Sequence, residues 1–177
     1  MLHDIDLVSL AADFTVAGQE YAEAQNLAAL NRSGATRFVT SARMMTMRAT
    51  IVATGTISVF EALLQQSLGW KNAFLALDSH LRKHGFDDLA ERFLDYRAAI
   101  NVLKHGTGKS HQRLIARRAQ LDFPVRELDQ PFHDEGDVSE ISTLVRADVE
   151  FVRKCARLVE EIATALRRTI ENPEVLS

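Results

Sequence analysis

Apolar residues recur every three or four positions over most of the chain, which is the spacing of one face of an α-helix. The pattern predicts helices over about 4–30, 40–68 and 70–84, and a fourth from Asp87 or Asp88 to the helix stop at Gly106. Asp88 and Glu91 have the spacing of a capping box at the start of that fourth helix. Four long helical segments therefore precede position 106.

Two positions of the second helix lead to specific expectations. Gly55 is interpreted as a tolerated weak point or as a site of close packing. Methionines more often fill irregular core space than bind a ligand, so the apolar stripe is expected to face inward. Its members include Met44, Met47 and Ile51.

The segment 106–136 is the least regular part, because it holds two of the three prolines and three of the eight glycines. It predicts a short helical piece near 111–121 and an extended stretch over 123–132. A long final helix is expected from a capping box at Asp137 and Glu140 to a stop at Asn172 and Pro173. Val145, Val149 and Val152 belong to its apolar stripe.

Together these elements predict an all-α fold: an up-and-down bundle of four to five helices with an irregular segment before the long last helix. Strands are nearly absent from the pattern. The 177 residues and 46% hydrophobic content suit one domain over 1–177.

Composition narrows the class of protein. The net charge of -3 argues against a general nucleic-acid coat protein, so any RNA or DNA contact would be local. The single cysteine, Cys155, falls on an apolar stripe and predicts a buried thiol in a reducing compartment. The first residues lack the layout of a signal peptide, and no uninterrupted apolar run approaches a membrane span. We therefore expect a cytoplasmic protein without membrane contact.

One stretch has an unusual charge pattern. Between Tyr96 and Leu121 there are six Lys or Arg residues and no Asp or Glu, although the whole chain is slightly acidic. Within it, Arg97, Asn101 and His105 lie on one side of the fourth helix at successive turns. This local bias predicts a phosphate-bearing or otherwise anionic partner.

Three interpretations of this stripe remain open: a structural polar seam, an anion site without chemistry, and a catalytic site. In the third, the imidazole moves a proton at a ribose hydroxyl while nearby cations balance charge on the phosphate, and no metal or other cofactor is needed. The expected phosphate or RNA contacts are Lys104, Lys109, Ser110, His111 and Arg113.

Two other motifs are set aside. Gly108, Lys109 and Ser110 resemble the end of a nucleotide-binding loop, but the position of its first glycine holds Leu103 and the segment follows a helix. His80 and His84 are one turn apart but have no third ligand at matching spacing, so no metal site is predicted.

The segments INVLKHG (100–106) and GKSH (108–111), followed by an irregular stretch and a long last helix, resemble the HEPN superfamily. These are helical-bundle proteins of prokaryotic toxin–antitoxin, defence and RNA-processing systems. In its catalytic members an arginine, often followed by a polar residue, precedes a histidine by four to six positions, and two copies meet to cut RNA without metal. Asn101 and His105 match this pattern. The arginine position holds Ile100, and Arg97 is the nearest candidate.

The resemblance implies a homodimer through the helix carrying residues 89–105, which binds RNA or another phosphate-bearing ligand and acts as a metal-independent endoribonuclease. His105 would be the general acid or base, Arg97 and Lys104 the phosphate clamp, and Asn101 the orienting residue. The alternative is a noncatalytic helical dimerisation or protein-interaction module, whose loop 106–136 docks a partner protein such as an antitoxin. Ile100 at the arginine position favours the alternative.

Overall fold

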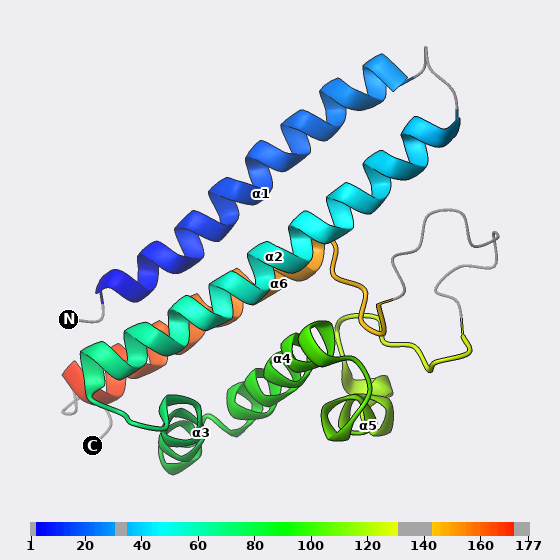
Figure 1. Ribbon diagram of the computed structural model, residues 1–177. Coiled ribbons are helices and arrows are strands. Elements are labelled where there is room, and N and C mark those ends of the chain that lie inside the picture. Colours follow the sequence, from blue (N-terminus) through cyan, green and yellow to red (C-terminus); the bar gives the residue numbers. More distant parts are fainter. Residues whose placement is uncertain (1–2, 31–34, 131–142, 172–177) are drawn as a thin grey trace.

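A computed structural model describes residues 3–30, 35–130 and 143–171, and it is all-α (Figure 1). Six α-helices and two short helical turns occur in these residues. They are α1 His3–Leu30, α2 Ala35–Leu68, α3 Ala73–Lys83, α4 Asp87–His105, α5 Lys109–Ala116, η1 Arg118–Gln120, α6 Val149–Leu166 and η2 Arg167–Glu171. The predicted all-α fold is confirmed.

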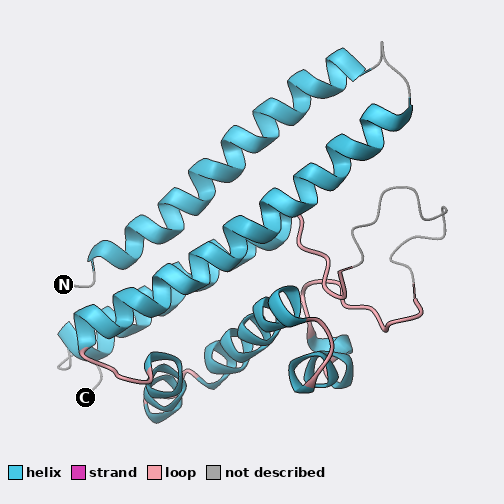
Figure 2. Cartoon of the chain, viewed as in Figure 1, coloured by secondary structure: helices cyan, strands magenta, loops and turns pink. Residues whose placement is uncertain are grey.

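The helices form a bundle in which α1 and α2 are an antiparallel pair and α6 packs against both. On the other side of α2 and α6 lies α4, with α3 and α5 at its two ends (Figure 1). Loops join these helices, and the described residues contain no strand beyond one isolated antiparallel bridge between Val125 and Val145 (Figure 2). The two long helices α2 and α6 therefore separate α1 from the α4–α5 junction.

Two groups of aromatic rings fill the core on either side of α4. Phe93 meets Phe60 and Phe74 with ring centroids 6.4 and 5.1 Å apart, both edge to face. Tyr96 meets Phe151 at 5.3 Å, and its hydroxyl donates to Asp122 Oδ1 over 2.9 Å. Such aromatic pairs bury large apolar areas and favour one relative orientation of the helices. The orientation of α4 is therefore set from both sides.

The last helix begins later than the sequence predicts. The prediction of a helix from 137 is wrong for residues 143–148, because Val145 forms the bridge to Val125 and the Arg126 N–H donates to the Leu144 carbonyl over 3.0 Å. The true N-cap is Asp148, whose carboxylate accepts from the Phe151 N–H over 3.0 Å. The predicted cap at 137 and 140 and the stop at 172 and 173 lie outside the described residues.

The helix in the irregular segment is also shifted. It begins at Lys109 and ends at Ala116, and the 3₁₀ turn Arg118–Gln120 follows it. The other helices fall where the apolar spacing predicts them, although α2 begins at Ala35, earlier than expected. The predicted capping box at Asp88 and Glu91 is wrong, because the N-cap of α4 is Phe86 without a side-chain cap and Glu91 accepts from Arg82 and Arg113 instead.

The inward orientation expected for part of α2 is wrong. Met44, Met47 and Ile51 are 58%, 56% and 64% exposed, while Ala53, Ile57 and other residues of the same helix form its buried side. The segment Arg43–Leu68 is also long and apolar enough to cross a membrane, with a mean hydropathy of 1.3 and only 33% of the window buried. A core helix of a soluble bundle can have the same length and composition as a membrane-spanning helix. These two properties therefore do not decide between the two, and the absence of a membrane span stays a prediction.

Candidate functional site

The predicted stripe lies at the C-terminal end of α4, where the chain turns into α5. The helix α4 ends at Gly106, whose φ of 74° is in the left-handed region that glycine adopts without strain. The Gly106 N–H donates to the Val102 carbonyl over 2.8 Å and closes the last turn. Only residues 106–108 separate the end of α4 from the first residue of α5.

The three stripe residues and the neighbouring Lys104 differ in exposure but share a lack of polar partners. Lys104 and His105 are exposed, while Arg97 and Asn101 are half-buried. None of these four side chains has a hydrogen bond or an ion pair within the described part of the chain. The Arg97 guanidinium instead lies over the ring of Phe74, 5.5 Å from its centroid, which is a cation–π contact.

The start of α5 adds backbone donors to this surface. Its N-cap is Gly108, which is exposed, and no side chain caps the helix. The first N–H groups of a helix have no acceptor within the helix and carry its positive dipole end, so they can bind an anion. Lys109, at the first position of α5, is exposed, and Ser110 beside it is half-buried.

His111 and Arg113, two of the predicted phosphate contacts, have partners inside the fold. His111 is buried, and its Nε2 lies 2.8 Å from the Arg126 carbonyl oxygen, to which it donates. Arg113 donates to Glu91 Oε2 over 3.0 Å and to Asp95 Oδ1 over 3.2 Å. These two side chains attach α5 to its neighbours. They differ in this from the stripe residues, whose side chains have no polar partner among the described residues.

The charge bias of 96–121 is therefore partly neutralised. Arg117 pairs with both carboxylate oxygens of Asp95, and Arg118 donates to Gln130. Arg82, followed by Arg113, holds the pKa of Glu91 below its ordinary value through hydrogen bonds and charge. The acids that neutralise the stretch precede it on α4, so a charge count within the stretch misses them. Three of its cations, Arg97, Lys104 and Lys109, have neither an acidic partner nor a hydrogen-bonded one in the described residues, whereas Arg118 is bound only by the neutral Gln130 amide.

The position at which the HEPN resemblance predicts an arginine is a core position in this protein. Ile100 is 4% exposed and packs in the hydrophobic core. A guanidinium there would have to lose its hydration without a partner, which is costly. Arg97, one turn before Asn101, is the cation of the stripe.

Neither the cysteine nor the histidine pair offers a second chemical site. Cys155 is fully buried, as predicted, and burial raises the pKa of its thiol well above the ordinary value. His80 Nε2 lies 2.7 Å from Thr169 Oγ1, and His84 Nδ1 donates to the His80 carbonyl over 2.9 Å. Among the described residues, no group of three His, Cys, Asp or Glu side chains could hold a metal ion.

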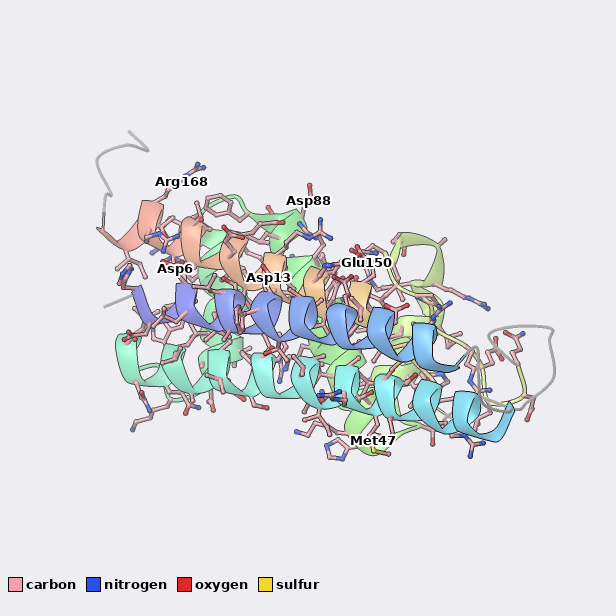
Figure 3. The ribbon with its side chains drawn as sticks, turned by 90° about the horizontal axis from the view of Figure 1, so that it is seen from above. Asp6, Asp13, Met47, Asp88, Glu150 and Arg168 are labelled. Atoms are coloured by element: carbon pink, nitrogen blue, oxygen red, sulfur yellow. The ribbon has the colours of Figure 1, made fainter. Side chains whose placement is uncertain are left out.

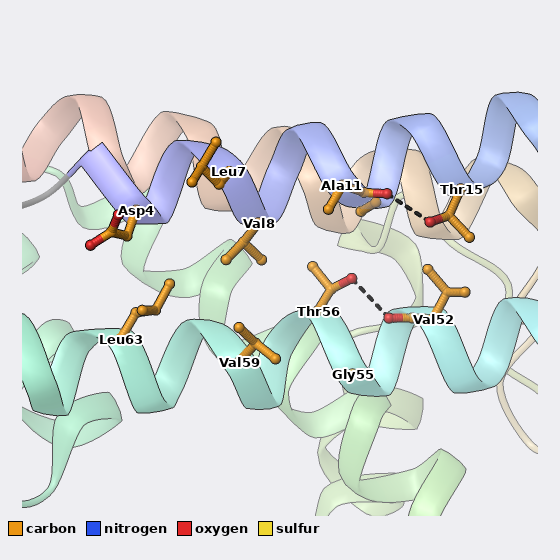
Figure 4. Close-up of a pocket in the computed structure, with 11 residues that line it drawn as sticks. Asp4, Leu7, Val8, Ala11, Thr15, Val52, Gly55, Thr56, Val59 and Leu63 are labelled. Atoms are coloured by element: carbon orange, nitrogen blue, oxygen red, sulfur yellow. Dashed lines mark hydrogen bonds between the residues drawn. The ribbon is translucent and has the colours of Figure 1, made fainter.

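A second feature was not found from the sequence. An open groove of about 450 Å³ runs between α1 and α2, and most of its lining is apolar (Figure 4). Helical spacing identifies apolar positions, but it cannot tell which of them a neighbouring helix covers.

Comparison with protein-family models, with curated proteins and with solved structures finds no match to this chain. The resemblance to the HEPN superfamily stays a prediction that rests on residues 100–111 and on the order of the helices.

Proposed function

We propose that the end of α4 and the start of α5 bind the phosphate groups of RNA. The observation that carries the proposal is that three cations close together at this junction, Arg97, Lys104 and Lys109, have no hydrogen-bonded or ion-pair partner among the described residues. The other three basic residues of the stretch have partners within the fold.

Each group has a distinct part in the proposed contact. Lys104 and Lys109 are flexible point charges that follow a phosphate backbone, whereas the Arg97 guanidinium is oriented by the Phe74 ring. The uncapped amides of α5 add donors of fixed direction. Asn101 can donate to or accept from a ribose hydroxyl or a base edge. Because the whole chain carries a net charge of -3, the contact stays local.

Binding of labelled single-stranded RNA by fluorescence anisotropy tests the proposal. The salt slope is the change in the logarithm of the binding constant with the logarithm of the salt concentration. For single-stranded RNA each cation that contacts a phosphate contributes about -0.7 to this slope, so three contacts predict a slope of about -2. The double variant Lys104→Gln, Lys109→Gln should reduce the slope by about 1.4 and weaken binding by roughly tenfold at low salt.

The matched control is Lys71→Gln with Lys83→Gln. Both lysines are exposed; Lys71 precedes α3 and Lys83 is its last residue, and α3 lies at the far end of α4 (Figure 1). The control variant should bind RNA like the natural protein. No binding at 50 mM salt, or equal losses in both double variants, would exclude this RNA site.

The HEPN-like cleavage is a separate part of the proposal. His105 is an exposed imidazole next to Lys104 at the end of α4, and an imidazole can take a proton from a ribose hydroxyl. RNA incubated with the natural protein in EDTA should give fragments that the His105→Ala variant does not give. Identical patterns would leave RNA binding without cleavage. The second candidate function is a noncatalytic dimerisation or protein-interaction module, which the buried Ile100 favours and which would show no salt-dependent RNA binding.

A further inference from the structure

The outer face of α1 and α2 exposes an unusual amount of apolar surface. Seven of the ten large apolar side chains that are exposed in the described residues belong to these two helices. They include Phe14 at 80%, Ile51 at 64%, Met44 at 58%, Leu7 at 55% and Val59 at 50%. Seen from above, α1 and α2 lie side by side with no described element in front of them (Figure 3). Exposed apolar side chains gathered on two adjacent helices are typical of an interaction surface.

The helix α1 is apolar on two opposite sides. Ile5, Ala12 and Val16 are buried, whereas Leu7 and Phe14 point away from the core. A surface helix of a monomer has one apolar side and one polar side. The second apolar side of α1 has the composition of a core, and no element of the described residues covers it.

The groove between the two helices suits an apolar occupant. Its two hydroxyl groups already have acceptors on their own helices, since Thr15 donates to the Ala11 carbonyl over 2.7 Å and Thr56 to the Val52 carbonyl over 2.8 Å (Figure 4). Gly55 is exposed in the groove, and a Cβ at this position would meet no atom within 4 Å. The absence of a side chain there leaves room for another helix to approach closely.

Opposite charges lie at the two ends of the groove. Asp4 lines one end, opposite Leu63 (Figure 4). Arg48 precedes Val52, which lines the other end, by one helical turn. Neither charge has an ion-pair partner in the described residues. Because Asp4 lies opposite Leu63, the separation of the two charges can be counted along α2. Arg48 precedes Leu63 by 15 residues, which is roughly 22 Å at 1.5 Å per residue, and the midpoint of this span falls at Gly55.

We propose that a second copy of this chain docks on this face, antiparallel, about a twofold axis near Gly55. A twofold interface uses the same surface on both copies, so the surface must complement itself. Rotation about this axis brings Asp4 of each copy to Arg48 of the other, and it places the open space at Gly55 at the closest approach. The two helix pairs then form a four-helix arrangement that covers Leu7, Phe14 and Ile51.

The available area is sufficient for such a dimer. The face extends along α2 from Leu63, opposite Asp4, to Met44, which is roughly 30 Å at 1.5 Å per residue. Two adjacent helices of ~10 Å diameter make it about 20 Å wide. About 600 Å² per copy gives about 1,200 Å² in total, at the lower end of stable interfaces. This interface differs from the dimer through residues 89–105 that the family resemblance implies, since α4 is on the other side of α2 and α6.

Sedimentation equilibrium of the full chain tests the proposal. The natural protein should show a mass twice the 19.8 kDa of one chain at micromolar concentration. Gly55→Gln should raise the dimer dissociation constant at least 100-fold, because the side chain occupies the place of the facing helix. Its helical circular dichroism should be unchanged, since the position has ordinary helical geometry and open space.

Charge reversal tests the antiparallel register. Asp4→Arg and Arg48→Asp should each weaken the dimer tenfold or more, because the symmetry creates two like-charge contacts. The double variant should recover most of the affinity. Asp13→Arg combined with Arg48→Asp is the matched control and should not recover it, because Asp13 is exposed but does not line the groove.

Three outcomes would overturn the proposal. One is a natural protein that stays monomeric at 100 μM. A second is a dimer insensitive to Gly55→Gln and to both charge reversals, which would place the interface elsewhere. The third is a monomer that binds phosphatidylcholine vesicles through this face, which would make a lipid surface the occupant.

Discussion

At the residue scale, the buried ion pairs of Asp95 serve the fold. The Asp95 side chain is 7% exposed and accepts from both Arg113 and Arg117. Loss of a partner from a buried, charge-assisted hydrogen bond leaves groups whose hydration is incomplete. Asp95→Asn should therefore lower the free energy of unfolding by about 1–3 kcal/mol, measured by urea denaturation.

A surface pair provides the comparison. Arg157 and Glu150 are 57% and 52% exposed, and an exposed pair contributes about 0–1 kcal/mol. Arg157→Gln should therefore change stability by less than Asp95→Asn does. Equal effects of the two substitutions would contradict the structural role of Asp95.

The roles of single residues were predictable only where the interaction is local. The spacing of Arg97, Asn101 and His105 correctly places them at successive turns of one helix. The partners of His111 and Arg113 are Arg126, Glu91 and Asp95, which lie 15 to 22 positions away. A pattern within one helix carries no information on such contacts, so both residues were expected at the phosphate site.

At the scale of elements, α3 is linked to the C-terminal turn η2 by a histidine. His80 donates from Nε2 to Thr169 Oγ1, since the Thr169 hydroxyl itself donates to the Ala165 carbonyl. Burial, followed by the charges of His84 and Lys83, holds the pKa of His80 below 6.5. The folded state therefore favours the neutral imidazole.

This link predicts a loss of stability on mild acidification. As the pH falls through 6.5, the unfolded chain takes up a proton at His80 while the folded chain does not, so the free energy of unfolding decreases. His80→Gln keeps a donor for Thr169 and should make stability less dependent on pH between 7.5 and 5.5. Glu91, whose pKa is lowered, contributes only below about 4.5. An unchanged pH dependence in the variant would contradict this role of His80.

The bounds of the elements show how far apolar spacing determines structure. It predicts α1 to α4 well, because these helices have long periodic stripes between breaking residues. Val145 continues the stripe of α6 in the sequence, but its pairing with Val125 and the cap at Asp148 exclude it from the helix. Tertiary pairing thus overrides a periodic pattern at its end.

At the scale of the whole molecule, the two proposed surfaces lie apart, because α2 and α6 separate α1 from the α4–α5 junction (Figure 1). A dimer through α1 and α2 would leave both α4–α5 junctions open. It would thus carry two phosphate sites. A long RNA can reach both sites, and the second contact then benefits from a high effective concentration.

This arrangement predicts that dimerisation changes RNA affinity only when the RNA is long. For an 8-nucleotide RNA, which reaches one site, the natural protein and Gly55→Gln should bind with equal affinity per chain. For a 40-nucleotide RNA, the natural protein should bind roughly tenfold or more tightly than the monomeric variant. Anisotropy titrations at one salt concentration provide both ratios. Weaker binding of the short RNA by Gly55→Gln would show that the groove itself contributes to RNA binding. An affinity ratio between the natural protein and the variant that is the same for both RNA lengths would show that one RNA cannot reach both sites.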